Sequence, residues 1–159
     1  MSTPKLVLIC IDGSEHSSRA LEWYFNEVHH KHNEVGLVHV HIPPNIPVGF
    51  GIHGNEQVIA NDFYRQAVQE TISASKAVVE MHKEKCMAQG VTPKVFLKTL
   101  DDSAGHTICT IAQENNASLI VVGQRGLGAI RRTLFGSVSD YILHHARIPV
   151  LVSVPPGKK

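Results

Sequence analysis

The stretch of sequence that decides the fold reads Val121-Val122-Gly123-Gln124-Arg125-Gly126 and, after the nine residues 127–135, continues as Gly136-Ser137-Val138. It begins at the end of an apolar run, 118–122, which is typical of a buried strand. It leads into the segment 138–145, whose apolar residues recur with helical spacing. The three glycines and the serine of this motif therefore lie between the carboxyl end of a strand and the amino end of a helix.

A junction of this kind suits an anion. The first N–H groups of a helix have no partner within the helix, and glycine lets the backbone approach a phosphate closely. Ser137 can cap the helix or donate its hydroxyl to a phosphate oxygen, and Arg125, Arg131 and Arg132 add positive charge. A turn that needs glycine only for its own backbone is the alternative that this stretch, taken alone, leaves open.

Two familiar phosphate-binding motifs are excluded by their spacing. A P-loop ends in Gly-Lys-Ser or Gly-Lys-Thr, and no lysine occurs between Lys98 and Lys158. The dinucleotide fingerprint needs a third glycine after Gly126-Leu127-Gly128, at the position that Arg131 occupies.

Strand and helix patterns alternate along the rest of the chain. Apolar runs predict strands at Lys5–Ile11, Val35–Ile42, Lys94–Leu100, Leu119–Val122 and from Val150 onward. Helices are predicted from the Ser14 cap to about Val28, over Phe63–Gln89, after the cap Asp101-Asp102-Ser103, and over Val138–His145. This alternation predicts an α/β fold, a doubly wound parallel sheet of five strands with helices on both faces.

The region between the second strand and the second helix is the least regular part of the sequence. Its prolines and glycines predict an irregular loop over Pro43–Asn61. The helix that follows is expected to pack through one apolar stripe, made of Phe63, Ala67, Ala74, Val78 and Met81.

Size and composition narrow the possible functions. At 159 residues and 17.4 kDa the chain is expected to form one domain, 1–159. The formal net charge of +1 gives no reason to expect a nucleic-acid partner, and no apolar run is long enough to span a bilayer. The three cysteines form no close pair and the N-terminus lacks a signal-peptide pattern, so a cytoplasmic location is expected.

The spacing Gly-x-x-Gly, nine residues, Gly-Ser resembles the nucleotide-binding signature of the universal stress protein family, in its ATP-binding branch. The flanks fit as well, since Leu8–Ser14 looks like the family's first strand with its acidic turn and Ile148–Val154 looks like its last strand. The resemblance covers about Lys5–Val154 and is weakest across Pro43–Asp62. It implies the strand order 3-2-1-4-5, with the turn after the first strand facing the glycine stretch.

Matched position by position, the resemblance implies a site for ATP, with Mg²⁺ on the phosphates. Asp12 takes the acidic position that contacts adenine or ribose, Val40 a position whose backbone contacts adenine, and Val122 an apolar position beside the nucleotide. The positions that contact phosphate or ribose are taken by Gly123, Gly126, Gly136, Ser137 and Val138, and Arg125 lies where the family varies. The residues themselves leave open that Asp12 only forms a turn and that Val40 is an ordinary core valine. Cys10 departs from the family, several of whose members carry proline there.

No catalytic or metal-binding group is predicted. His29 and His32 share a helix face but have no third ligand fixed by the sequence. His39 and His41 alternate with Val40, so both are expected on the opposite side of the sheet. No Gly-x-Ser-x-Gly elbow or Cys-x-x-Cys pair occurs.

The sequence therefore predicts an ATP-binding universal stress protein, a nucleotide-dependent stress-response or signalling module that hydrolyses ATP slowly if at all. A homodimer is expected through the apolar edge strand Val150–Val154, which has no charge to prevent pairing with another chain. A slow ATPase or nucleotide-dependent transferase is the alternative from the enzyme class. A dimeric interaction module that works without nucleotide is the third hypothesis.

Overall fold

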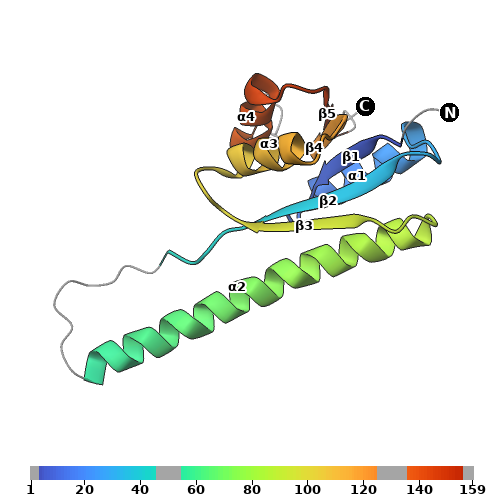
Figure 1. Cartoon of the computed structure of the whole chain (residues 1–159). Coiled ribbons are helices and arrows are strands. Elements are labelled where there is room, and N and C mark those ends of the chain that lie inside the picture. Colours follow the sequence, from blue (N-terminus) through green and yellow to red (C-terminus); the bar gives the residue numbers. More distant parts are fainter. Residues whose placement is uncertain (1–3, 46–54, 125–135, 156–159) are drawn as a thin grey trace.

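The structure, a computed structural model, describes residues 4–45, 55–124 and 136–155 (Figure 1). Strands and helices alternate along the chain as the sequence predicts. In chain order the elements are β1 (Leu6–Cys10), α1 (Glu15–Glu27), β2 (Glu34–His41), α2 (Asn55–Ala88), β3 (Lys94–Thr99), α3 (Ala104–Glu114), β4 (Leu119–Gly123), α4 (Ser137–His145) and β5 (Val150–Ser153).

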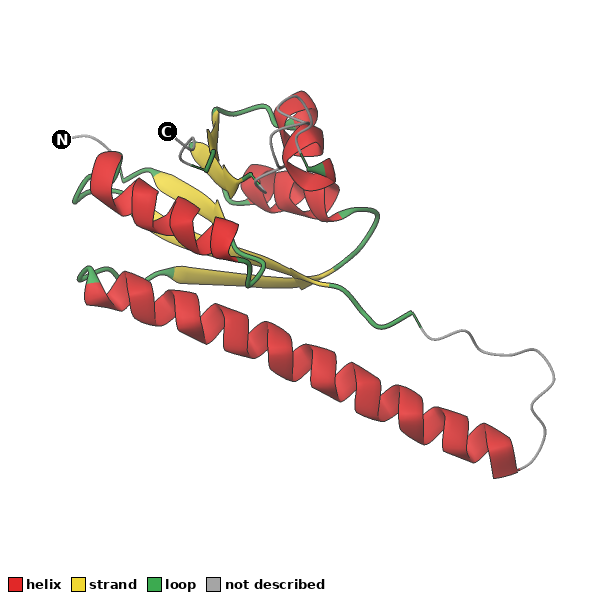
Figure 2. Cartoon of the chain, turned by 180° about the vertical axis from the view of Figure 1, so that it is seen from behind, coloured by secondary structure: helices red, strands yellow, loops and turns green. Residues whose placement is uncertain are grey.

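The five strands form one parallel sheet in the order β3-β2-β1-β4-β5, which confirms the predicted fold and strand order. Strands β1 and β4 pair in parallel, with Ile9 of β1 beside Val121 of β4. Helices α3 and α4 cover one face of the sheet, and α1 and α2 cover the other (Figures 1 and 2). Because all strands run the same way, their carboxyl ends meet along one edge.

Strand β1 shows why the apolar run at the start of the sequence forms a strand buried on both faces of the sheet. All five of its residues are buried, as expected for a central strand covered on both faces. Leu8 packs into the aliphatic cluster beneath α3 and α4, whereas Ile9 packs into the cluster beneath α1 and α2. Burying one such side chain contributes about 1.5–3 kcal/mol, so this strand anchors both layers.

Two serines begin helices as predicted. The N–H of Ser17 donates to Ser14 Oγ at 3.2 Å at the start of α1, and the N–H of His106 donates to Ser103 Oγ at 3.1 Å at the start of α3. Both serines lie directly after turns that follow strands. These caps fix where each helix leaves the sheet edge, which is also the edge that carries the candidate site.

Helix α2 differs from its prediction at its N-terminal end. It begins at Asn55, eight residues before the predicted Phe63, so the expected loop over Pro43–Asn61 is wrong from Asn55 onward. The physical reason is that the last helix-breaking residue before the predicted start is Gly54. The early part of α2 extends past the sheet in Figure 1, and there Phe63 is 66% exposed.

The packed face of α2 also differs from its prediction. Of the expected stripe, Val78 packs against the core and Ala67 is half-buried, but the prediction is wrong for Phe63, Ala74 and Met81, which are exposed. The residues that α2 buries against the rest of the protein are instead Ser75, Val79, His82 and Cys86. Two of these four are polar, so an apolar pattern could not reveal the face.

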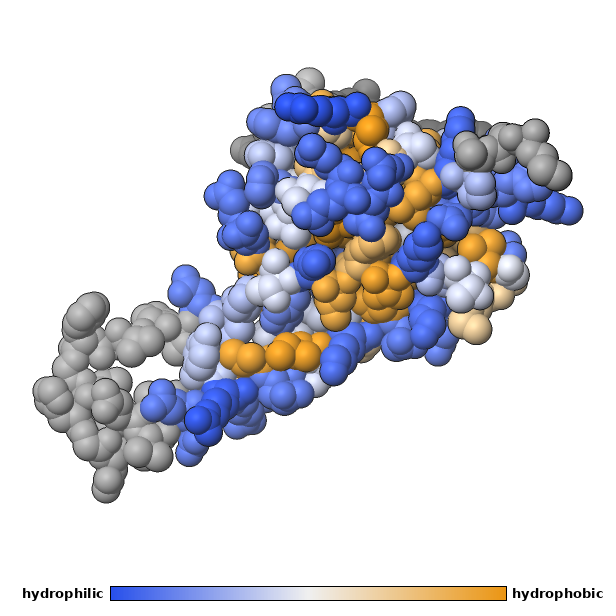
Figure 3. Space-filling view, in the orientation of Figure 1, coloured by the Kyte–Doolittle hydropathy of each residue, from blue (hydrophilic) through white to orange (hydrophobic). Residues whose placement is uncertain are grey.

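The sheet has two exposed edges. Strand β3 forms one of them, and its Val95 and Leu97 remain partly exposed. On the face seen in Figure 3, apolar side chains gather between the α3–α4 part of the molecule and α2, where β3 lies. Strand β5 forms the other edge. Within the described residues, no helix has the length and apolar character needed to cross a membrane.

Candidate functional site

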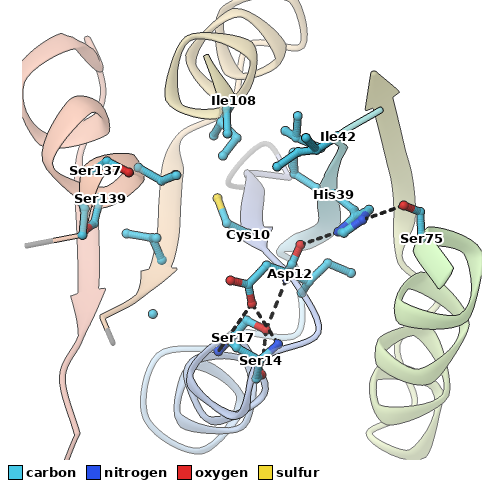
Figure 4. Close-up of a pocket in the computed structure, with 18 of the residues that line it drawn as sticks. Cys10, Asp12, Ser14, Ser17, His39, Ile42, Ser75, Ile108, Ser137 and Ser139 are labelled. Carbon is cyan, nitrogen blue, oxygen red and sulfur yellow. Dashed lines mark hydrogen bonds between the residues drawn. The ribbon is translucent and has the colours of Figure 1, made fainter. Parts of the chain in front are cut away.

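A cleft of about 530 Å³ opens at the carboxyl ends of β1, β2 and β4 (Figure 4). The chain adds β2 and β3 on one side of β1 and β4 and β5 on the other, so the strand order reverses between β1 and β4. Ligands of open parallel sheets bind at such a reversal point. The volume lies within the range of small-molecule and cofactor pockets.

Asp12 lies at the centre of the cleft, in the turn between β1 and α1. One oxygen of its carboxylate accepts a hydrogen bond from the N–H of Ser14 at 3.0 Å and another from the Ser14 hydroxyl at 2.5 Å. The turn interpretation of Asp12 is therefore confirmed. The same side chain lines the cleft, so shaping the turn and contacting a ligand are compatible.

Gly123, at the end of β4, also lines the cleft and has a packing role of its own. A Cβ atom at this position would lie 2.5 Å from the carbonyl oxygen of His16 in α1. Glycine therefore lets the end of β4 approach the backbone of α1. The predicted contact of Gly123 with phosphate is not tested by this packing and stays a prediction.

Gly136 directly precedes α4, and few of the described atoms lie near the place of a Cβ there. It is the N-cap residue, so the expectation that Ser137 caps the helix is wrong, and no side chain among the described residues caps α4. Among the described residues, a Cβ at Gly136 would meet Ser139 Oγ alone, at 3.8 Å, which is ordinary contact. The N-terminus of α4 therefore presents main-chain N–H groups to the cleft, an arrangement that favours an anion.

The wall of the cleft between Asp12 and the N-terminus of α4 is apolar. Val40, Ile108 and Val122 line it, together with Cys10, whose sulfur points into the cleft (Figure 4). Burial, with smaller contributions from nearby Cys109 and Asp12, raises the pKa of the Cys10 thiol to about 12. Cys10 is therefore a neutral, apolar part of the wall at neutral pH, where a flat aromatic ring can pack.

The side of the cleft formed by α2 was not predicted. Thr71, Ala74 and Ser75 contribute to it from α2, and His39 contributes from β2. The prediction that His39 and His41 share a side of the sheet fits their common contact with α2 through Ser75. The pair His39-x-His41 in a strand was the one sequence signal for this polar wall, whereas Ser75 gave none.

Hydrogen bonds fix the orientation of the two histidines. The Nδ1–H of His39 donates to the carbonyl of Ile11 at 2.8 Å, and we assign its Nε2 as the acceptor in the second bond of the ring. The Ser75 hydroxyl, 3.1 Å away, then donates to this Nε2. Ser75 Oγ in turn accepts from the Nδ1–H of His41 at 3.0 Å. Through this chain of bonds Ser75 of α2 links both histidines of β2.

A second buried histidine pairs α2 with α1. His82 is fully buried; its Nδ1–H donates to the carbonyl of Val78 at 2.8 Å, and its Nε2 accepts from the Ser18 hydroxyl at 3.1 Å. Burial lowers the pKa of His82. The ring is therefore neutral at neutral pH and holds the two helices together without charge.

The cleft brings together every predicted site residue that the structure describes. They are Asp12, Val40, Val122, Gly123, Gly136, Ser137 and Val138. Arg125 and Gly126 lie outside the described residues, as do Arg131 and Arg132. Over residues 4–45, 55–124 and 136–155, no group of three or more His, Cys, Asp or Glu side chains could hold a metal ion.

The Universal stress protein family model matches residues 4–155. The chain belongs to the universal stress protein family. Over 157 residues it is 26% identical to the universal stress protein YxiE of Bacillus subtilis, an alignment that covers 92% of this chain and 96% of the relative.

Solved structures share the fold of this universal stress protein. The structure of the protein MJ0577 is similar with a TM-score of 0.73 at 22% identity, over 99% of this chain and all of the other. A universal stress protein family protein from Arabidopsis thaliana, solved with AMP bound, is similar with a TM-score of 0.63 at 21% identity, over 97% and 94% of the two chains. At these identities the similarity establishes the fold.

Proposed function

We propose that this universal stress protein binds ATP in the cleft between Asp12 and the N-terminus of α4. The observation that carries the proposal is the open, uncapped start of α4 at Gly136, which faces the reversal point of the sheet across an apolar wall. Main-chain N–H groups suit the phosphates of a nucleotide, and an apolar wall suits its base. A carboxylate can accept hydrogen bonds from the ribose hydroxyls. The AMP bound to the Arabidopsis relative supports a nucleotide in this fold.

Each part of the nucleotide has a partner in this proposal. The adenine packs on the apolar wall beside Val40 and Val122, and the ribose hydroxyls donate to the Asp12 carboxylate. The phosphates accept hydrogen bonds from the first N–H groups of α4, at Ser137 and Val138. Arg125 and Gly126, beyond the described residues, are proposed to complete the phosphate side.

Mg²⁺ is proposed to arrive with the nucleotide. Asp12 is the one carboxylate among the described residues that line the cleft, and one of its oxygens already accepts two hydrogen bonds from Ser14. The protein therefore offers Mg²⁺ few ligands of its own. A magnesium ion in such a site is held mainly by phosphate oxygens and water.

We propose a nucleotide-dependent signalling or stress-response role rather than fast catalysis. Hydrolysis of ATP needs a positioned water and charge stabilisation at the γ-phosphate. Asp12, which is proposed to hold the ribose, is the one lining carboxylate in the part of the chain that the structure describes. A slow ATPase or transferase is the second candidate function. A catalytic group in addition to the residues assigned here would distinguish it from the signalling role.

The proposed active form is a homodimer of a single domain, in the cytoplasm. Strand β5 pairs with β4 on one side and forms an edge of the sheet on the other, and its Val150, Leu151 and Val152 are partly buried. Edges without charge pair readily with another chain. The unpaired thiols of Cys10, Cys86 and Cys109 fit a reducing compartment.

Mass spectrometry of the natively purified protein tests the nucleotide directly. We expect co-purified adenine nucleotide, and a dissociation constant in the micromolar range, about −8 kcal/mol, when Mg-ATP is added to the stripped protein. A preparation that carries no nucleotide and gives no thermal shift with Mg-ATP would reject ATP binding. Single-turnover assays then separate the two candidates: turnover near ~10 s⁻¹, typical of enzymes, would favour the ATPase.

Light scattering tests the dimer separately. We expect a dimer mass at tens of micromolar protein for the natural chain. Leu151→Lys should shift the protein toward the monomer, because it places a charge on the edge strand. The control Leu143→Lys, on the exposed side of α4, should leave the mass unchanged. A monomer mass for the natural chain contradicts the dimer.

A further inference from the structure

A second cleft, of about 460 Å³, lies on the other side of the α3–α4 pair. It is bounded by the C-terminal half of α3, the C-terminal half of α4 and the segment that leads into β5. None of its lining residues belongs to the first cleft. Nothing in the proposed ATP site therefore accounts for it.

The floor of this second cleft is apolar. Ala112, Ala117 and Ile120 are buried there, and Ile148 completes the floor from the segment before β5. An apolar floor of this kind favours a ligand with a hydrocarbon body, because its contact with the floor removes both surfaces from water.

The rim of the second cleft is basic. Arg147 and two imidazoles, those of His106 and His145, line the cleft together with the neutral polar residues Thr110, Gln113 and Asn116, and no aspartate or glutamate does among the described residues. The ring of His145 stacks on Tyr141, with centroids 3.9 Å apart, which holds that imidazole at the rim. A guanidinium without a competing carboxylate in the same cleft suits an oxyanion.

One polar atom of the second cleft lacks a partner within the described part of the chain. Nδ1 of His106 is buried and makes no hydrogen bond there. An unpaired buried polar atom costs about 1–3 kcal/mol. Because the His106 ring lines the cleft, a ligand that draws this nitrogen toward the cleft and pairs with it removes that cost.

From these observations we infer that the second cleft is a binding site for a small organic acid, with its hydrocarbon part on the apolar floor and its carboxylate at Arg147 and His106. This inference is independent of the proposed ATP site. The two sites share no lining residue among those described, although α3, α4 and β4 each contribute to both. On α3, Ile108 lines the first cleft and Cys109 lines the second.

Benzoate and its neutral analogue benzamide are the probes that test this site. The ¹⁵N-labelled full-length protein is titrated with each compound, and amide shifts are followed. We expect benzoate to shift the amides of 109–117 and 145–148 in a saturable way, with a dissociation constant of about 1 mM, or −4 kcal/mol. Benzamide should bind at least about fivefold more weakly, since it lacks the charge that Arg147 recognises.

Variants then show whether the rim recognises the acid. Arg147→Gln and His106→Phe should each weaken benzoate binding by about fivefold or more, because each removes a group offered to the carboxylate. The matched control Arg65→Gln changes an exposed arginine on α2 and should leave binding unchanged. Absence of saturable shifts, equal binding of benzamide, or equal effects of Arg147→Gln and Arg65→Gln would each overturn the inference.

Discussion

The two faces of the sheet are covered by different chemistry. Under α3 and α4 the contacts are aliphatic, made by residues such as Leu8, Ile111 and Ile142. Under α1 and α2 an aliphatic cluster is joined by a buried polar layer, in which His39, Ser75 and His82 make hydrogen bonds. Both layers meet at the cleft, so the candidate site has one apolar wall and one polar wall.

This difference shows how the side chains of each layer determine the arrangement of its helices and strands. Aliphatic packing is non-directional and tolerates rearrangement, whereas a hydrogen-bonded layer permits few relative positions of its elements. The hydrogen bonds of the polar layer therefore fix the position of α2 over β2. On the α3–α4 face, the free energy gained by burying apolar surface comes mainly from the aliphatic side chains.

The largest expected effect is a cavity in the aliphatic layer. Leu8 is fully buried on the α3–α4 face, so Leu8→Ala should lower the free energy of unfolding by about 2–5 kcal/mol. The control Leu97→Ala, on the exposed edge strand β3, should cost much less. Denaturant unfolding measures both. Equal losses for the two variants would show that the α3–α4 layer does not carry the packing energy assigned to it.

A smaller loss is expected from the polar layer. Ser75→Ala removes the hydroxyl that bonds both His39 and His41, and leaving these ring nitrogens unpaired should cost about 1–3 kcal/mol. Ser73→Ala is the matched control, because it makes the same change at an exposed position two residues away on α2. If chemical denaturation finds Ser75→Ala no less stable than Ser73→Ala, the hydrogen-bond chain does not hold α2 in place.

The pH dependence of stability separates the two layers further. Burial lowers the pKa of His82, whereas the unfolded chain takes up the proton near the ordinary value of about 6.5. The unfolded state then binds more protons, so this contribution is complete above about pH 6.5 and is lost as the pH falls below it toward the folded pKa. One histidine can account for at most about 1.4 kcal/mol per pH unit.

Unfolding followed between neutral pH and pH 5 checks this dependence. His82→Gln should flatten the acid-side loss of stability, while Ser73→Ala, a change without a titrating group at an exposed position on α2, should leave it as in the natural chain. Identical slopes for the natural chain and His82→Gln would assign the pH dependence to other groups.

The sequence predicted the aliphatic part of the molecule well. The apolar run of β1, the caps Ser14 and Ser103 and the strand order agree with the structure, because each depends on local pattern or on the family resemblance. The seven predicted site residues that the structure describes were matched to the family position by position, and they line one cleft. The packing role of Gly123, by contrast, depends on the approach of His16, a contact between segments far apart in the sequence.

The polar layer could not be predicted. Ser75 and His82 look like solvent-facing residues in a helix pattern, and only their partners on β2 and α1 show why they are buried. Hydrophobic periodicity therefore selected the wrong face of α2, through Ala74 and Met81. Partners fixed by tertiary structure leave no signal in the pattern of a single helix.

The central claim is that main-chain groups at the start of α4 hold the phosphates of ATP. Calorimetric titration of Gly136→Val with Mg-ATP tests it most directly, because a Cβ at this position makes only ordinary contact with the described residues, at Ser139 Oγ. We expect Gly136→Val to keep its fold and lose at least about tenfold in affinity, or 1.4 kcal/mol. The control Ala77→Val, on the exposed side of α2, should bind like the natural chain. Equal affinities for Gly136→Val and Ala77→Val would contradict the account.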